Sequence, residues 1–415
     1  STGLKALKQV AGFSGEMSIE NVVFVLGPRI NAAGRIKHAK AAVQLLLAED
    51  FDDALAFAYE IQANNTERKG HDSRITEEAL EMIKKDKDGK MWVEIERLIS
   101  VFDNSEITQR HISVEPEWLS KEHSFKERSE IFSDVSLQLA KQAIVECLAG
   151  VNTTPAKIDN IIYVTSTGVM TPTLDASLFN ELEFSRHIKR LPLWGLGCAG
   201  GAAGISRAMD LAKAYPKENV LVVAVELCSL TFQKDDLSKS NIVAASLFGD
   251  GCACALIAGD ENELSVNEKC PELIASLSTI YDNSLDVMGW DIVETGFSVV
   301  FSRDIPTIVK ENVKPNITEL LSMHSLEIED IKHYITHPGG LKVINAYEES
   351  LGVKTGTLNI SRKILKEHGN MSSPSVIYVL DEFLKNIQST KAGEYGLISS
   401  LGPGFSSELV LFKTT

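Results

Sequence analysis

Residues 191–204 have the sequence Leu-Pro-Leu-Trp-Gly-Leu-Gly-Cys-Ala-Gly-Gly-Ala-Ala-Gly, and this stretch says most about the fold. An apolar strand runs into Gly197 and Cys198, and a run of small residues then opens a helix. Free backbone N–H groups and the positive end of the helix dipole lie at such a start. This setting lowers the pKa of a thiol and favours the thiolate. Cys198 is therefore predicted to be a nucleophile, although most free cysteines are simply buried.

The sequence around this stretch alternates between short apolar runs and amphipathic segments from Met91 onward. The predicted helices cover residues 136–148, 204–214, 305–323 and 373–386, and the predicted strands cover 160–164, 220–225, 252–257, 333–336, 395–399 and 408–412. The alternation favours an α/β fold in which helices cover the strands. The acidic stretch 259–273 has little strand pattern and is predicted to separate two halves, 89–265 and 266–415.

Residues 1–88 have a different character and are predicted to be mostly helical. Apolar residues recur at helical spacing over 41–61 and 75–83, and residues 21–26 could form one short strand. The polar residues 84–90 then fit a junction between two parts of the chain.

Composition narrows the class of protein. The chain has 415 residues, 44% of them hydrophobic, which is enough for two or three domains. Its net charge of −16 argues against nucleic acid as the main partner. None of the six cysteines forms a CxxC pair, so we expect reduced thiols, a cytoplasmic location and no metal site. No signal peptide and no run of 18 apolar residues is found, which argues against secretion and a membrane span.

Two further residues are candidates to act with the thiol. His337 ends an apolar strand and is followed by Pro-Gly-Gly, which leaves its imidazole at the carboxyl rim of a sheet, where α/β active sites lie. Asn370 follows a glycine and precedes a helix. Each signal is weak alone, because a single His or a Gly-Asn pair is usually structural. His333 has no partners for a metal site and is interpreted as structural.

The three residue types suit one kind of chemistry. A thiolate accepts an acyl group from a thioester, and a neighbouring imidazolium keeps the thiol ionised. His and Asn N–H groups can then hold the carbonyl oxygen of a malonyl thioester and stabilise the enolate that decarboxylation leaves. This chemistry requires neither a metal nor a redox cofactor.

Five motifs occur in the order found in chalcone-synthase-like enzymes, and the chain resembles that family from about residue 91. They are Gly-Cys-Ala-Gly-Gly at 197–201, Leu-Phe-Gly-Asp-Gly at 247–251, His-Pro-Gly-Gly at 337–340, Gly-Asn-Met-Ser-Ser at 369–373 and Leu-Gly-Pro-Gly-Phe at 401–405. The chain is most similar to bacterial type III polyketide synthases that make alkylpyrones. This similarity covers about Trp92 to Phe412.

The resemblance implies a thiolase-like αβαβα layered fold and a homodimer. It implies that Cys198 becomes acylated, that His337 and Asn370 are its partners, and that acyl-CoA and malonyl-CoA are the substrates. Phe248 matches an aromatic gatekeeper between a CoA tunnel and the cavity, and Thr171 a residue that reaches into the partner's cavity. The remaining positions that it assigns to the substrate cavity and its frame are Ser166, Thr231, Gly289, Ser372, Gly402, Pro403 and Gly404.

The chain departs from the family pattern in two places. Asn104 and Thr108 stand where plant relatives carry basic residues that bind CoA phosphates. The family's first strand and helix are absent before Trp92, and residues 1–86 instead resemble an internal piece of RecJ-like DHH exonucleases. The motifs of that likeness are Gly-Pro-Arg-Ile-Asn-Ala-Ala-Gly-Arg at 27–35, Ala-Val-Gln-Leu-Leu-Leu-Ala-Glu-Asp at 42–50 and Asn-Asn-Thr-Glu-Arg at 64–68.

The RecJ-like piece is not expected to act on DNA. The metal-binding Asp and Asp-His-His motifs of those nucleases are missing, so the piece cannot supply a two-metal site. It carries 12 Lys and Arg residues against 14 Asp and Glu residues up to position 89, which is not the composition of a basic DNA-binding arm.

Three functions remain open from the sequence. The leading one is a type III polyketide synthase that condenses an acyl-CoA starter with malonyl-CoA and gives alkylpyrone-type products. The second is a β-ketoacyl-acyl-carrier-protein synthase III-like enzyme with the same fold and catalytic residue types. The third is a catalytically impaired chimera without nuclease activity, because loss of an early strand would expose backbone groups and apolar surface.

Overall fold

The computed structural model describes residues 2–10, 45, 48, 50–59, 101–236, 238–266, 270–302 and 304–415. The chain divides into two compact units, Ser1–Glu96 and Arg97–Thr415. In the first unit, α1 (Thr2–Val10) and residues 51–59 are helical, which confirms part of the helix predicted over 41–61. The predicted strand at 21–26, the helical pattern at 75–83 and the junction at 84–90 lie outside the described residues.

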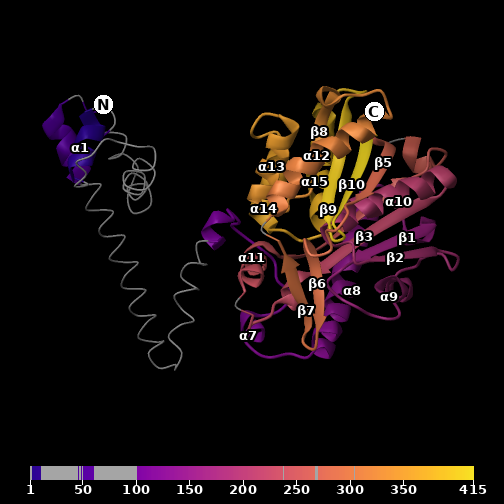
Figure 1. The fold of residues 1–415 in the computed structure, drawn as a ribbon. Coiled ribbons are helices and arrows are strands. Elements are labelled where there is room, and N and C mark those ends of the chain that lie inside the picture. Colours follow the sequence, from indigo (N-terminus) through magenta and orange to yellow (C-terminus); the bar gives the residue numbers. More distant parts are fainter. Residues whose placement is uncertain are drawn as a thin grey trace. The chain divides into compact units, whose positions relative to one another are not determined.

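The first half of the second unit is built on a four-stranded sheet with the order β2-β1-β3-β4 (Figure 1). β1 (Asn160–Thr165) pairs in parallel with both β2 (Lys189–Trp194) and β3 (Asn219–Leu227). β4 (Asp250–Ala258) runs antiparallel to β3. β3 consists mainly of Val, Leu and Ala, and all nine of its residues are buried, as expected for a strand covered on both faces.

The second half repeats this arrangement with the order β5-β10-β9-β8. β8 (Ile331–Thr336) is parallel to β9 (Tyr395–Gly402), and β10 (Ser406–Lys413) is antiparallel to β9. β5 (Glu272–Ile280) pairs antiparallel with β10. Strands β8, β9 and β10 therefore match β1, β3 and β4 in order and direction, so the unit contains one pattern twice.

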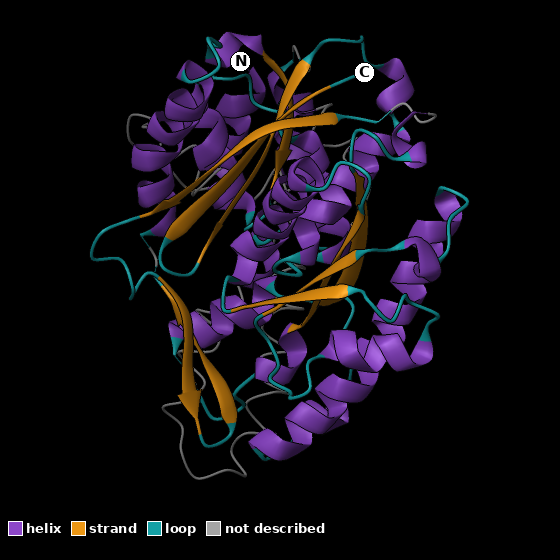
Figure 2. Cartoon of the chain, turned by 90° about the vertical axis from the view of Figure 1, so that its right-hand side faces the viewer, coloured by secondary structure: helices purple, strands orange, loops and turns teal. Residues whose placement is uncertain are grey.

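Helices fill the space between the two sheets and cover their outer faces (Figure 2). α10 (Gly200–Ala214) and α15 (Pro374–Lys385) lie between the sheets, where their apolar residues share one core with β1, β3, β9 and β10. α8 (Phe125–Gly150) and α9 (Leu174–Glu181) cover the first sheet, and α12 (Ile305–Ser322) and α13 (Leu341–Leu351) cover the second. This is the helix–sheet–helix–sheet–helix layering that the family resemblance implied.

The second unit also contains further helices and a β-hairpin. They are α7 (Pro116–Leu119), α11 (Lys239–Leu247), α14 (Asn359–His368) and the hairpin of β6 (Met288–Val293) and β7 (Gly296–Phe301). Short 3₁₀ turns are η2 (Pro155–Lys157), η3 (Gly197–Ala199), η4 (Cys228–Thr231), η5 (Glu263–Val266), η6 (Ile328–Asp330) and η7 (Ile387–Ser389). None of the helices in the described ranges combines the length and apolar character that crossing a lipid bilayer requires.

All six predicted strands and all four predicted helices of this unit are confirmed. The strands β5, β6 and β7 were not expected. β5 mixes Leu and Ile with Ala, Ser and Thr, and its residues are exposed or only partly buried, so its pattern is weak. It also begins at Glu272, inside the stretch 259–273 that the sequence suggested as a separator.

Candidate active site

The sharp turn at Cys198 is held by close backbone packing. Cys198 lies in η3, between β2 and α10, and is 4% exposed. Gly197 has a φ of +46°, in the left-handed region that glycine adopts readily. A Cβ at Gly197 would lie 2.7 Å from Pro403 Cδ, and one at Gly201 would lie 2.2 Å from the Ser373 carbonyl oxygen. Larger side chains would clash at these positions, so the close packing around Cys198 requires small residues.

Asn370 links the thiol to two other loops. Its side-chain oxygen and nitrogen both lie 4.0 Å from Cys198 Sγ, and its Nδ2 donates to the Gly339 carbonyl at 3.3 Å. Its backbone forms an isolated bridge with Phe248: Asn370 N donates to Leu247 O and Gly249 N donates to Asn370 O, both at 2.9 Å. Asn370 is thus held by hydrogen bonds of both its side chain and its backbone.

His337 occupies the carboxyl end of β8, as predicted. Its backbone N–H donates to Ser399 O on β9 at 2.8 Å, and its side chain is buried. Among the described residues, neither ring nitrogen has a hydrogen-bond partner. The next residues of the same turn supply the Gly339 carbonyl that Asn370 contacts. Unpartnered buried nitrogens are rare in folded proteins, so this imidazole is available to a substrate.

Burial sets the charge state of this pair, and the outcome differs from the sequence-based expectation. Loss of hydration raises the pKa of Cys198 to about 11, although hydrogen bonds from Ser372 and Asn370 act in the opposite direction. Burial also lowers the pKa of His337 to about 3. The prediction of a thiolate in the resting protein was wrong, because burial outweighs the helix start. The resting pair is a neutral thiol and a neutral imidazole.

Glu226 is the site residue that the sequence analysis missed. It is fully buried near the end of β3. Its carboxylate accepts hydrogen bonds from Ser166 N (2.9 Å), Ser166 Oγ (3.0 Å), Thr167 Oγ1 (2.7 Å) and Ser373 Oγ (2.8 Å). Burial raises the pKa of Glu226, whereas the hydrogen bonds from these donors act to lower it. The signal was present, since Glu226 is the one charged residue in the apolar run 219–228.

The other predicted site residues fall into two groups. Ser166 and Ser372 belong to the cluster, since Ser372 N donates to Asn370 Oδ1 at 2.8 Å and Ser372 Oγ lies 3.5 Å from Glu226 Oε1. The loop Gly402, Pro403 and Gly404 packs on the cysteine turn, because a Cβ at Gly402 would lie 2.3 Å from Leu196 O.

The other predicted positions are Phe248, Thr231, Gly289 and Thr171. Phe248 reaches the cluster through its backbone bridge to Asn370. Thr231 is buried in η4 and donates to Cys228 O at 2.8 Å. A Cβ at Gly289, on β6, would meet nothing within 4 Å, so this glycine borders open space. Thr171 is exposed in the loop before α9.

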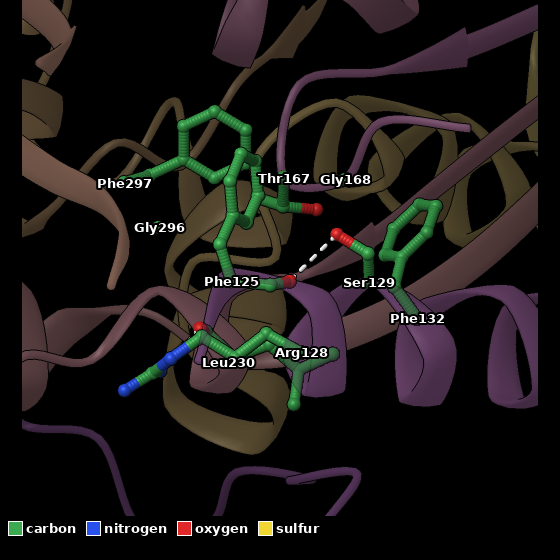
Figure 3. Close-up of a pocket in the computed structure, with 9 residues that line it drawn as sticks. All are labelled: Phe125, Arg128, Ser129, Phe132, Thr167, Gly168, Leu230, Gly296 and Phe297. Atoms are coloured by element: carbon green, nitrogen blue, oxygen red, sulfur yellow. Dashed lines mark hydrogen bonds between the residues drawn. The ribbon is translucent and has the colours of Figure 1, made fainter. Parts of the chain in front are cut away.

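A small cavity is lined in part by Thr167 and Gly168, the residues that follow Ser166 (Figure 3). It encloses about 10 Å³, roughly the space of one water molecule, and Phe125, Phe132 and Phe297 form its apolar lining. A second cavity of about 320 Å³ lies along α14 and is lined by Arg362, Lys366 and Glu106 among others. Neither cavity is lined by Cys198, His337 or Asn370. In the described ranges, no group of three His, Cys, Asp or Glu side chains could hold a metal ion.

Comparison with known proteins identifies the family. The family of chalcone and stilbene synthases matches over most of the chain, with its N-terminal domain at residues 70–261 and its C-terminal domain at residues 272–415. The chain belongs to this family. It is therefore an enzyme of the type III polyketide synthase class, with a thiolase-like fold.

Individual relatives agree with this assignment. A Bacillus subtilis protein named "Putative chalcone synthase" is 45% identical over 327 residues, 77% of this chain and 89% of the relative. The "Alpha-pyrone synthesis polyketide synthase-like" protein of Mycobacterium tuberculosis is 31% identical over 324 residues, 76% of this chain and 82% of the relative. The crystal structure of 1,3,6,8-tetrahydroxynaphthalene synthase from Streptomyces coelicolor matches with a TM-score of 0.74 and 29% identity, over 82% of this chain and 94% of that chain.

The family match begins before the expected start near Met91. It includes residues 70–86, which the sequence analysis assigned to the RecJ-like piece. The boundaries predicted at 88/89 and 265/266 stay predictions.

Proposed function

We propose that this enzyme loads an acyl-CoA starter on Cys198 and extends it with malonyl-CoA by decarboxylative Claisen condensation, giving alkylpyrone-type products. The observation that supports it most is the position of Cys198 Sγ, buried and 4.0 Å from the Asn370 amide, with the unpartnered imidazole of His337 in the adjoining turn. The type III polyketide synthase family to which the chain belongs supports the same chemistry.

Acyl loading requires a proton transfer, because the resting thiol is neutral. As Cys198 Sγ attacks the thioester carbonyl of acyl-CoA, an unprotonated ring nitrogen of His337 takes the thiol proton. The C–S bond to CoA breaks, and the imidazolium returns that proton to the departing CoA thiolate. The products of this half-reaction are acyl-Cys198, free CoA and neutral His337.

Extension uses the same imidazole as a hydrogen-bond donor. The N–H groups of His337 and Asn370 hold the thioester oxygen of malonyl-CoA, the bond to the carboxylate breaks, and carbon dioxide leaves. The enolate carbon attacks the carbonyl of acyl-Cys198, a C–C bond forms and the C–S bond to Cys198 breaks. The Cys198 thiolate then takes a proton from solvent, and the β-ketoacyl-CoA can be loaded again.

One observation supports the pyrone product, and a second supports the class of enzyme. A relative of Mycobacterium tuberculosis carries α-pyrone synthesis in its name. The family match favours a polyketide synthase over a β-ketoacyl-acyl-carrier-protein synthase III-like enzyme, which would require a carrier-protein extender. We keep the RecJ-like origin of the first residues as a hypothesis, and we expect the purified chain to show no nuclease activity.

We also propose that the enzyme is a homodimer. β2 is an edge strand, and in the described part of the sheet it pairs only with β1. Its side chains Leu191 and Trp194 are 39% and 48% exposed, and Val169 on the neighbouring loop is 40% exposed. An unpaired edge beside exposed apolar side chains favours pairing with a second chain. Thr171 is exposed on the same loop, so it could reach a partner's cavity.

Incubation with long-chain acyl-CoA and malonyl-CoA, followed by mass spectrometry of the protein and products, tests the assignment. The wild-type protein should gain one acyl group on Cys198 and release extended products. Cys198→Ala should lose both, whereas Cys270→Ser, at an exposed cysteine, should keep both. Product formation by Cys198→Ala at the wild-type rate would refute the proposed function.

A further inference from the structure

Residues 108–113 connect the two loops that carry Phe248 and Asn370. Thr108 N and Oγ1 donate to Lys366 O at the end of α14, at 2.8 and 2.9 Å. His111 O accepts from Asp250 N at 2.8 Å, and Ser113 N donates to Asp250 Oδ2 at 2.6 Å. The segment is therefore bonded to the elements on both sides of the Phe248–Asn370 bridge.

Arg110 is the central side chain of this segment. Its Nη1 donates to Phe248 O at 3.1 Å and also to Ala245 O, which are carbonyls at the C-terminal end of α11. A cation there caps carbonyls that the helix leaves open and complements the negative end of its dipole. Among the described residues Arg110 forms no ion pair. Its charge therefore acts mainly on backbone oxygens; burial lowers the pKa of Arg110, and the charge of Asp250 acts to raise it.

Two glycines let the Arg110 side chain reach both loops at once. A Cβ at Gly369, the residue before Asn370, would lie 2.8 Å from Arg110 Cγ and 3.0 Å from Leu247 O. A Cβ at Gly249, the residue after Phe248, would lie 3.0 Å from His368 O and 3.4 Å from Arg110 Cβ. The stem of Arg110 consequently packs on one loop while its guanidinium binds the other.

We infer that Arg110 is a positioning residue, which sets the placement of the Asn370 amide and the Phe248 ring by clamping the two loops together. This inference rests on the proposed function. Decarboxylation depends on where the Asn370 N–H group points, whereas acyl loading depends mainly on Cys198 and His337. Loss of the clamp should therefore slow decarboxylation more than acyl loading.

A competing role for Arg110 is contact with a CoA phosphate, because it is a cation close to Asn104 and Thr108. The two roles differ in one measurable respect. A positioning residue matters equally for a malonyl thioester of CoA and for malonyl-pantetheine thioester, which has no phosphate. A phosphate contact matters only for the CoA form.

The experiment compares Arg110→Met, Arg110→Lys and Gln109→Ala, the last being an exposed neighbour in the same segment. For Arg110→Met we expect kcat for decarboxylation to fall about tenfold to a hundredfold with both thioesters, the size of a misplacement of about 1 Å. Acyl loading on Cys198 should change less than about threefold, so the loss in decarboxylation should exceed the loss in loading by at least about threefold. Arg110→Lys should recover part of the loss, and Gln109→Ala should match the wild type.

Hydrogen exchange gives a second readout that does not need activity. The N–H groups of Asn370 and Gly249, which form the backbone bridge, should exchange faster in Arg110→Met than in Gln109→Ala. A loss confined to the CoA thioester, or unchanged exchange at the bridge, would overturn the positioning role. An inactive wild-type protein with the expected exchange pattern would instead reject the proposed function and leave the clamp supported.

Discussion

His337 is uncharged at neutral pH because its surroundings exclude water, and this gives the folded protein a definite acid sensitivity. Its pKa is about 3 in the folded state and near 6.5 in an unfolded chain. The unfolded state therefore binds a proton first as the pH falls below 6.5. The stability that the neutral imidazole contributes is fully present above pH 6.5 and is lost as the pH falls toward 3.

The expected result is a smaller acid dependence in His337→Gln. Between pH 6.5 and 4, His337 should account for up to about 1.4 kcal/mol of lost unfolding free energy per pH unit. Urea unfolding at a series of pH values gives the slope of the unfolding free energy against pH for the wild type and the variant. His324→Gln, at an exposed histidine, serves as control and should keep the wild-type slope. Equal slopes for wild type and His337→Gln would contradict a buried neutral imidazole.

Glu226 provides a second prediction for a single residue. Its two oxygens accept only, and the Ser166 backbone N–H that donates at 2.9 Å cannot turn away. In Glu226→Gln the amide oxygen can keep this N–H, but the NH₂ group then replaces the oxygen that accepts from Ser166 Oγ and Ser373 Oγ, so both hydroxyls must give up their present donor role. We expect a loss of about 1–3 kcal/mol in unfolding free energy, the cost of disrupting these buried hydrogen bonds. Denaturant unfolding measures this loss. Glu319→Gln, at an exposed glutamate, is the control and should change the unfolding free energy very little.

The residues of the site differed in how well the sequence predicted them. Cys198 and Asn370 were found because their turns require glycines and because the motifs resemble a family. Their placement 4.0 Å apart agrees with the prediction that they meet. The charge of the thiol could not be predicted, because it depends on burial by residues far along the chain. Glu226 was missed because its partners, Ser166 and Ser373, lie on other elements.

Among the elements, α10 shows most directly how packing overrules local preference. Gly201 lies in the first turn of this helix, and a Cβ there would lie 2.2 Å from Ser373 O and 2.6 Å from Val376 Cγ1. Helix propensity alone would favour alanine over glycine by about 1 kcal/mol. We expect Gly201→Ala to destabilise the protein by about 1–3 kcal/mol instead, since it forces α10 and α15 apart.

Gly150, the last residue of α8, supplies the matched control. A Cβ there would meet nothing within 4 Å, so Gly150→Ala should be neutral or stabilising by up to about 1 kcal/mol. Thermal or urea unfolding of both variants gives the comparison. Equal effects of the two substitutions would contradict the close contact between α10 and α15.

The elements whose sequence pattern is weak are those whose stability comes from neighbours. β2 contains Pro192 and is mostly exposed, and proline in a run normally argues against a central strand. It is an edge strand, where proline is tolerated. The hairpin of β6 and β7 has mixed residues and packs under α11, so its local pattern is weak. The long buried strands were predicted because both of their faces are apolar.

At the scale of the whole molecule, the duplicated pattern of the two halves brings the site residues together. Cys198 follows β2 of the first sheet, and His337 follows β8 of the second. The strand β8 corresponds to β1, so the two chemical groups come from the same end of related halves. The alternation of strands and helices predicted the class of fold, but the meeting of the halves depends on α10 and α15 packing between the sheets.

The oligomeric state gives the last prediction. If the β2 edges of two chains pair, a charge in the middle of this edge should prevent assembly. Leu191 is 39% exposed on β2, and in Leu191→Asp two carboxylates would lie close to the pairing edge and repel each other. Size-exclusion chromatography with light scattering should show a dimer for the wild type and a monomer for this variant, with condensation activity reduced. Met323→Asp, at the 61% exposed residue after α12, should remain a dimer. A dimeric Leu191→Asp would place the interface on another surface, because a charge on a paired edge is incompatible with a dry strand–strand contact.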